Sequence, residues 1–250
     1  MDKSELNNST VIKNISTDQS EILRWIMDLY CDGEAFDCDM TASELKFYGK
    51  RNGCKYDIPV PKILMDVYPM SDEIIKITPF ERLPLEDNSI KSIVCDLPFI
   101  CSPKTCKSVV EKKEGANLIS NRFSSWYPMQ EGYENIYWWM NECARVIKDM
   151  GVIIWKMQSS VSGGLQHLLS EFSLLCAADA NLYTIDRFNM LAKARLISAS
   201  KIKKQMHSRK YTSDFWVFQK NEKKNKKTNI LTKLKECKDN VFEGKVWPLK

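Results

Sequence analysis

The residues best placed to do chemistry lie at positions 92–99, a largely apolar, β-branched run that ends in an acid and an aromatic ring. A proline cannot continue a strand, so Pro98 predicts that Asp96 and Phe99 lie at the carboxyl end of a buried strand. In an open α/β sheet, ligands bind at that edge. The Asp96 carboxylate and the Leu97 main-chain carbonyl can both accept hydrogen bonds from an exocyclic amine, while the Phe99 ring stacks on a flat base.

This quartet resembles a known signature. Asp96, Leu97, Pro98 and Phe99 are similar to the Asp-Pro-Pro-aromatic motif of DNA amino-methyltransferases, which methylate adenine N6 or cytosine N4 with S-adenosylmethionine. The resemblance implies that these four residues hold the target base. Leu97 stands where the motif has its first proline, so the carbonyl acceptor is kept and the stiffness of the proline is lost. The alternative is an ordinary strand end, in which Phe99 belongs to the core and Asp96 caps a turn.

Composition limits the class of protein. The chain has 250 residues, of which 44% are hydrophobic, which suffices for one sizeable α/β core. It shows neither a bilayer-spanning apolar run nor a signal peptide, so we expect a cytoplasmic protein without membrane contact. Nine scattered cysteines without a CxxC pair indicate reduced thiols, and the presence of only two histidines argues against a structural zinc site. No metal is expected.

A first cofactor loop is predicted after a short strand at residues 35–40. The residues from Asp39 to Tyr48 follow the pattern Asp-x-Thr-x-Ser-x-x-x-Phe-Tyr, which resembles one group of phage and bacterial DNA methylases. The resemblance implies contacts to the methionine part of S-adenosylmethionine from the small and acidic residues here, namely Asp37, Asp39, Thr41 and Ser43. The usual glycine-rich loop is missing, because no glycine precedes Gly49. A generic junction of strand and loop is the alternative.

Two further segments fit the same order. Residues 62–69 read as a second strand that ends in Asp66, where a carboxylate can bind both hydroxyls of a ribose; the alternative is that Asp66 caps a turn before Pro69. A short third strand is expected at 73–77. The run from Leu83 to Ile90 then resembles the Leu-Pro-x-x-Asp-x-Ser-hydrophobic stretch that precedes the fourth strand of class I methyltransferases, which implies that Leu83 lies along the adenine of the cofactor. Three weak signals in the expected order reinforce one another.

The remaining periodicity completes the predicted fold. We expect a helix from Thr17 or Asp18 to Gly33, and the later elements are helices at 133–148 and 162–180, the second bearing His167, and strands at 150–156, 182–190 and 214–220. Together these elements predict a Rossmann-like class I methyltransferase: a mostly parallel seven-stranded sheet with an antiparallel last strand and helices on both faces. Residues 1–16 are expected to be a flexible arm, 17–220 the methyltransferase domain, and 221–250 a lysine-rich tail that includes a short helix.

Basic residues suggest a nucleic-acid partner. The segments 100–132 and 191–213 are expected to be substrate-binding loops, the first because basic residues alternate with aromatics and the second because acids are nearly absent. The residues expected to contact nucleic acid are Lys104, Arg122, Lys193, Arg195, Lys203, Lys204, His207, Arg209 and Lys210. Phosphate contacts of this kind predict binding that weakens steeply with salt.

These observations favour an S-adenosylmethionine-dependent methyltransferase that acts on an exocyclic amine of DNA, adenine N6 ahead of cytosine N4. The base would be flipped out of the duplex. The absence of any Pro-Cys dipeptide argues against a C5-cytosine enzyme, which needs a cysteine nucleophile. An RNA methyltransferase and a decayed, nucleic-acid-binding module with the same fold are the alternatives.

Overall fold

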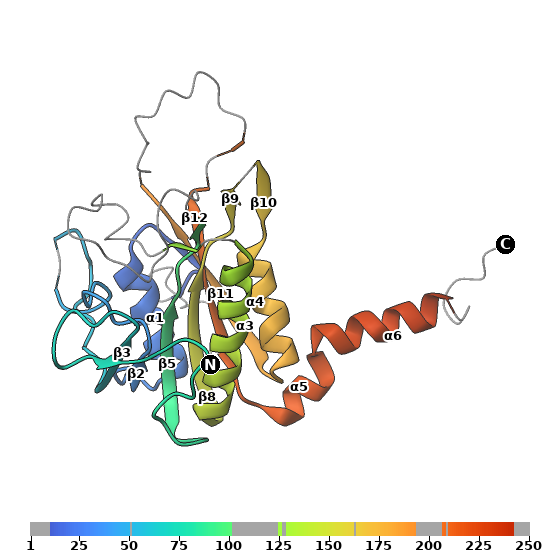
Figure 1. Cartoon of the computed structure of the whole chain (residues 1–250), viewed down its shortest axis with the longest axis horizontal. Coiled ribbons are helices and arrows are strands. Elements are labelled where there is room, and N and C mark those ends of the chain that lie inside the picture. The colour runs from blue at the N-terminus through green and yellow to red at the C-terminus, as the bar shows by residue number, and fades with distance from the viewer. Residues whose placement is uncertain are drawn as a thin grey trace, which may run out of the picture.

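The computed structural model describes residues 11–50, 52–101, 125–126, 129–162, 164–193, 207–208 and 210–242. Its core is an eight-stranded sheet in the order β1-β11-β12-β8-β5-β2-β3-β4 (Figure 1). The strands are β1 (Ile15–Ser16), β2 (Cys38–Asp39), β3 (Ile63–Asp66), β4 (Ile75–Lys76), β5 (Ile90–Asp96), β8 (Ile147–Met157), β11 (Tyr183–Leu191) and β12 (Thr212–Gln219).

Strand direction follows the prediction. The neighbours β4, β3, β2, β5 and β8 are all parallel, whereas β12 runs antiparallel to both β8 and β11. The predicted fold class, a Rossmann-like sheet of the class I methyltransferase type with an antiparallel last strand, is therefore confirmed. The sheet has eight strands rather than seven, because β1 adds to its edge beside β11.

Helices cover both faces of the sheet. Helix α1 (Gln19–Tyr30) begins at Asp18, whose Oδ1 accepts the main-chain N–H of Ser20, and it packs with Phe36, Phe188 and Phe215 on one face. Helices α3 (Met129–Val146) and α4 (Leu169–Asp179) cover the other face (Figure 1). Their apolar sides bury the central strands β5 and β8, whose middle residues, 93–95 and 152–155, are continuous hydrophobic runs because both faces are covered.

One predicted helix is shorter than expected. The segment 162–180 begins as a hairpin of β9 (Ser160–Ser162) and β10 (Leu165–His167), so His167 lies on a strand and not near a helix start. Glycines occupy both positions between Ser162 and Leu165, and Gly164 adopts a φ of 78°, which suits a tight turn. The His167 Nδ1 lies 3.3 Å from the Tyr133 hydroxyl on α3.

Part of the expected arm and part of the expected tail form regular elements. Part of the expected arm forms β1, and the expected tail contains α5 (Glu222–Thr228) and α6 (Ile230–Phe242), the latter extending away from the sheet (Figure 1). Asparagines fix this region: Asn225 Nδ2 donates to Asn181 Oδ1, and Asn229 Nδ2 donates to the Ala178 carbonyl. Two smaller strands, β6 (Ile100–Cys101) and β7 (Ser125–Trp126), pair with each other. No helix in the described ranges is long and apolar enough to cross a bilayer.

Candidate active site

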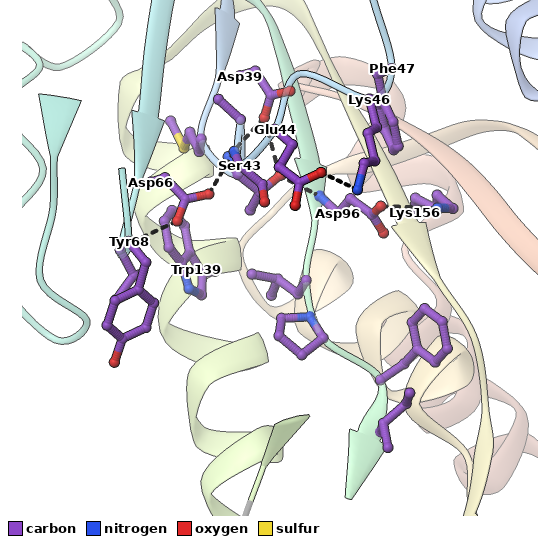
Figure 2. A pocket seen from close by; sticks show the side chains of 18 of the residues that line it. Asp39, Ser43, Glu44, Lys46, Phe47, Asp66, Tyr68, Asp96, Trp139 and Lys156 are labelled. Carbon is purple, nitrogen blue, oxygen red and sulfur yellow. Dashed lines mark hydrogen bonds and ion pairs between the residues drawn. The ribbon is translucent and has the colours of Figure 1, made fainter. Parts of the chain in front are cut away.

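A cleft of about 960 Å³ opens where β2, β3, β5 and β8 end (Figure 2). The sheet order brings these strand ends together, because all four strands run in the same direction. Most of the residues predicted for catalysis and cofactor binding line it, namely Asp39, Thr41, Ser43, Asp66, Asp96, Leu97, Pro98 and Phe99. Segments that lie far apart in the sequence thus share one site.

Asp39 anchors the first loop. Its side chain is buried, and its Oδ1 accepts the main-chain N–H of Thr41 at 2.7 Å while its Oδ2 accepts the Tyr48 hydroxyl at 2.6 Å. Burial raises the pKa of this carboxyl to about 6, against the opposing effect of these hydrogen bonds, and the charge of Asp96 adds to the rise. Asp39 therefore organises the loop from inside rather than facing solvent.

Thr41 couples this loop to the end of β5. Its hydroxyl donates to Asp39 Oδ1 at 3.1 Å and accepts the main-chain N–H of Asp96 at 2.8 Å. The hydroxyl thus uses its single donor and one acceptor position in a continuous chain. The backbone of Asp96 is held in place by a residue of the first loop.

The first loop turns without glycine. Ser43 has a φ of 44° and Leu45 a φ of 55°, both in the left-handed region that favours glycine. The Ser43 N–H donates to Asp66 Oδ2 at 2.8 Å, and the Tyr68 N–H donates to Asp66 Oδ1 at 2.7 Å. The Asp66 carboxylate therefore compensates for the strain in the loop and is itself oriented at the cleft (Figure 2).

A lysine that sequence reasoning did not assign to the site faces Asp96. The Nζ of Lys156 donates to Asp96 Oδ2 at 2.9 Å, and the two side chains are only 13% and 25% exposed. Lys156 also lies 4.9 Å from the centre of the Phe47 ring, a cation–π contact (Figure 2). Parallel pairing of β5 with β8 sets Lys156 opposite Asp96. A lysine at the end of the strand next to that of Asp96 is the signal that could have identified it.

The turn after Asp96 is braced by a tryptophan. Leu97 is buried at 3% exposure, and the carbonyl of the next residue, Pro98, accepts the Trp126 indole N–H at 2.6 Å. Trp126 in turn lies against Gly132 of α3, where a Cβ would lie 2.7 Å from the ring. No described residue donates to the Leu97 carbonyl. Trp126 thus supports the turn directly after Leu97, the residue that stands in place of a proline.

Two predicted cofactor residues lie outside the cleft lining. Asp37 precedes β2, and its carboxylate accepts the main-chain N–H of Lys91 at the start of β5. Leu83 is buried in the core, and its N–H donates to Glu142 of α3. Asp37 thus links the chain before β2 to the start of β5, and Leu83 links its loop to α3. Neither side chain lines the cleft, whose lining along β2 begins at Asp39.

Comparison with known proteins gives distant similarities. No protein-family model matches the chain, and neither does any curated protein. The chain is similar to the PvuII cytosine-N4-specific DNA methyltransferase, at 18% identity and a TM-score of 0.35, over 56% of this chain and 45% of that one. It thus spans less than half the length of that enzyme.

Two further structures are similar at lower identity. One is a complex of the Haloferax volcanii Trm112 methyltransferase activator with a candidate methyltransferase, at 11% identity and a TM-score of 0.35, over 83% of this chain and 80% of that one. The other is a candidate methyltransferase from Thermoplasma acidophilum, at 9% identity and a TM-score of 0.32, over 83% and 66% of the two chains.

Three of the residues predicted to contact nucleic acid belong to the described part of the chain. Lys193 and His207 are exposed, and Lys210 donates to the Ser208 hydroxyl at 3.1 Å. Lys193 follows the end of β11, and His207 and Lys210 precede the start of β12; none of the three lines the cleft, although Met190 of β11 does. The other residues expected to contact nucleic acid lie outside the described residues, namely Lys104, Arg122, Arg195, Lys203, Lys204 and Arg209.

Proposed function

We propose that this protein is an S-adenosylmethionine-dependent methyltransferase that acts on an exocyclic amine of a DNA base, adenine N6 ahead of cytosine N4. The observation that carries the proposal is that two carboxylates line one cleft, Asp66 at the end of β3 and Asp96 at the end of β5. The first suits a ribose and the second an amine.

The end of the cleft at Asp66, where the methyl donor would bind, fits a nucleoside. Asp66 accepts two main-chain N–H groups, which fix the orientation of its carboxylate in the cleft lining, and a carboxylate at this strand end is the group that suits the two hydroxyls of a ribose. The loop from Asp39 to Ser43 lies beside it and suits the methionine part of the donor. Bound S-adenosylmethionine would supply an electrophilic methyl group on a sulfonium.

The end of the cleft at Asp96, where the methyl-accepting base would bind, fits a flat ring that bears an amine. Lys156 holds one oxygen of Asp96, so the other oxygen, Oδ1, is available to accept an N–H from the amine. The Leu97 carbonyl offers a second acceptor, and Phe99 supplies a ring for stacking. When Asp96 and the Leu97 carbonyl accept the N–H groups of the amine, the lone pair of the amine nitrogen turns away from the base ring. The fixed geometry also lowers the entropic part of the barrier to methyl transfer.

Variants of the two carboxylates separate the roles. We expect Asp96→Ala to abolish methyl transfer while S-adenosylhomocysteine still binds, and Asp66→Ala to weaken that binding at least about tenfold, because a charged hydrogen bond is worth about 1.5–3 kcal/mol. Calorimetry with S-adenosylhomocysteine and transfer of a labelled methyl group to DNA measure the two effects. Asp179→Asn is the control, since this carboxylate of α4 is outside the cleft lining and, among the described residues, accepts a hydrogen bond only from the Tyr137 hydroxyl.

The result can reject the assignment. Wild-type activity in Asp96→Ala would show that the amine is not held at β5. Methyl transfer to RNA but not to DNA would change the substrate class while leaving the site in place, since an unpaired RNA base offers the same amine.

A further inference from the structure

One polar side chain in the cleft has an unused hydrogen-bonding group. Asn135 lies on α3, lines the cleft and is only 2% exposed. Its Oδ1 is buried, and no donor among the described residues reaches it. A buried acceptor without a partner is unfavourable, and asparagine is a poor helix former, so neither packing nor helix propensity explains this residue.

The orientation of the Asn135 side-chain amide follows from the hydrogen bond that its Nδ2 makes. The Nδ2 of Asn135 donates to the main-chain carbonyl of Glu131 at 2.9 Å. A carbonyl oxygen can only accept, so the group that meets it must be the NH2 and the group left over must be the oxygen. The unused atom is therefore an acceptor, and it requires a donor from a ligand.

The position of Asn135 indicates which end of the cleft it serves. Residues four apart share a face of a helix, so Asn135 lies between Glu131 and Trp139, which also line the cleft. Figure 2 shows Trp139 beside Tyr68 and Asp66, whereas Lys156 and Asp96 lie at the other end. The side chain of Asn135 lies one helical turn, about 5.4 Å, from that of Trp139, on the face of α3 that lines the cleft.

The surroundings at this end suit a purine. A base attached to a ribose at Asp66 would extend along the residues that follow β3 and β4, where Val67, Ile77 and Phe80 give the cleft an apolar wall. We propose that the Asn135 carboxamide oxygen accepts a hydrogen bond from the 6-amino group of the donor's adenine and thereby selects an adenine nucleoside. The proposal rests on the proposed use of S-adenosylmethionine and adds the residue that reads its base.

The test compares two donor-product analogues. S-inosylhomocysteine differs from S-adenosylhomocysteine in carrying a carbonyl oxygen in place of the 6-amino group, so two acceptors would face each other at Asn135. We expect the wild-type protein to bind the inosine compound at least about tenfold more weakly by calorimetry. Asn135→Leu, close in size and without polar atoms, should bind both compounds within about threefold.

A matched control is present on the same helix. Asn141 makes the equivalent bond, its Nδ2 donating to the main-chain carbonyl of Tyr137, four residues back along α3, at 2.8 Å, but it does not line the cleft. Asn141→Leu should keep the wild-type preference for adenosine. Circular dichroism of each variant verifies that it is folded.

Each outcome decides the matter. Equal wild-type affinities for the two compounds, or a preference that survives Asn135→Leu, would overturn the role of Asn135 while leaving the proposed methyltransferase function intact. Failure of S-adenosylhomocysteine to bind the wild-type protein at all would reject the donor, and with it both proposals.

Discussion

Replacing the buried Asp39 by asparagine should change how the stability of the protein depends on pH. In the folded chain burial raises the pKa of this carboxyl to about 6, against an ordinary value of 3.8. The folded state therefore binds the proton more tightly than the unfolded state does, so its stability is greatest below the ordinary value and falls as pH rises toward 6. Asparagine keeps the shape and cannot titrate.

The magnitude follows from the two pKa values. Between pH 4.5 and pH 7.5 the wild-type chain should lose about 2 kcal/mol of folding free energy through Asp39 alone. The stability of Asp39→Asn, measured relative to the wild type at each pH, should rise by that amount over the same range. Other titrating groups are common to both proteins and cancel in the difference.

Urea denaturation at four pH values between 4.5 and 7.5, followed by circular dichroism, measures this difference. Tyr48→Phe is an informative companion, because the hydroxyl of Tyr48 donates to Asp39 and lowers the pKa of its carboxyl. Its loss should steepen the fall in stability and extend it to higher pH. Parallel stability curves for wild type and Asp39→Asn would refute the view that this carboxyl is buried at the base of the first loop.

Three other variants test the parts of the site. Gly132→Ala would place a Cβ 2.7 Å from the Trp126 ring, so methyl transfer should fall at least about tenfold, in a kinetic assay, with donor binding unchanged. Ser43→Gly should stabilise the chain by about 0.5–1 kcal/mol in thermal unfolding by relieving a φ of 44°, and a loss of stability would contradict this. Lys156→Met should cost about 2 kcal/mol in urea denaturation by leaving the carboxylate of Asp96 without its partner; an unchanged midpoint would argue against the ion pair.

The strands that carry the site could be predicted because their signals are local. A β-branched run ended by Pro98 defined the end of β5, and an apolar run ended by an acid defined β3 with Asp66. Parallel strands that point the same way then bring their carboxyl ends to one edge, so the meeting of Asp66 and Asp96 in one cleft followed from the predicted fold class.

Residues that join the site through long-range packing could not be found in this way. Lys156 meets Asp96 through the register between β5 and β8, Trp126 reaches the Pro98 carbonyl across 28 residues, and Asn135 faces the cleft only because α3 crosses it. Each of these contacts depends on how two elements pack, which no single stretch of sequence encodes.

The hairpin of β9 and β10 was missed for a different reason. The apolar residues from Leu165 onward fit a helical period, yet the two glycines before them are a hairpin signal, and turn chemistry prevailed over periodicity. In the first loop the usual glycine signal is absent, yet the turn still forms. Ser43 and Leu45 adopt the left-handed conformation that glycine would favour.

The central claim is methyl transfer to an exocyclic amine, and one measurement tests it most directly. Purified protein is incubated with S-adenosylmethionine and mixed-sequence DNA, the DNA is digested, and its nucleosides are analysed by mass spectrometry, with Asp96→Ala in parallel. We expect N6-methyladenine, or N4-methylcytosine as the second candidate, from the wild type and neither from the variant. The absence of any methylated nucleoside from wild-type protein that binds the donor, in DNA and in RNA alike, would contradict it.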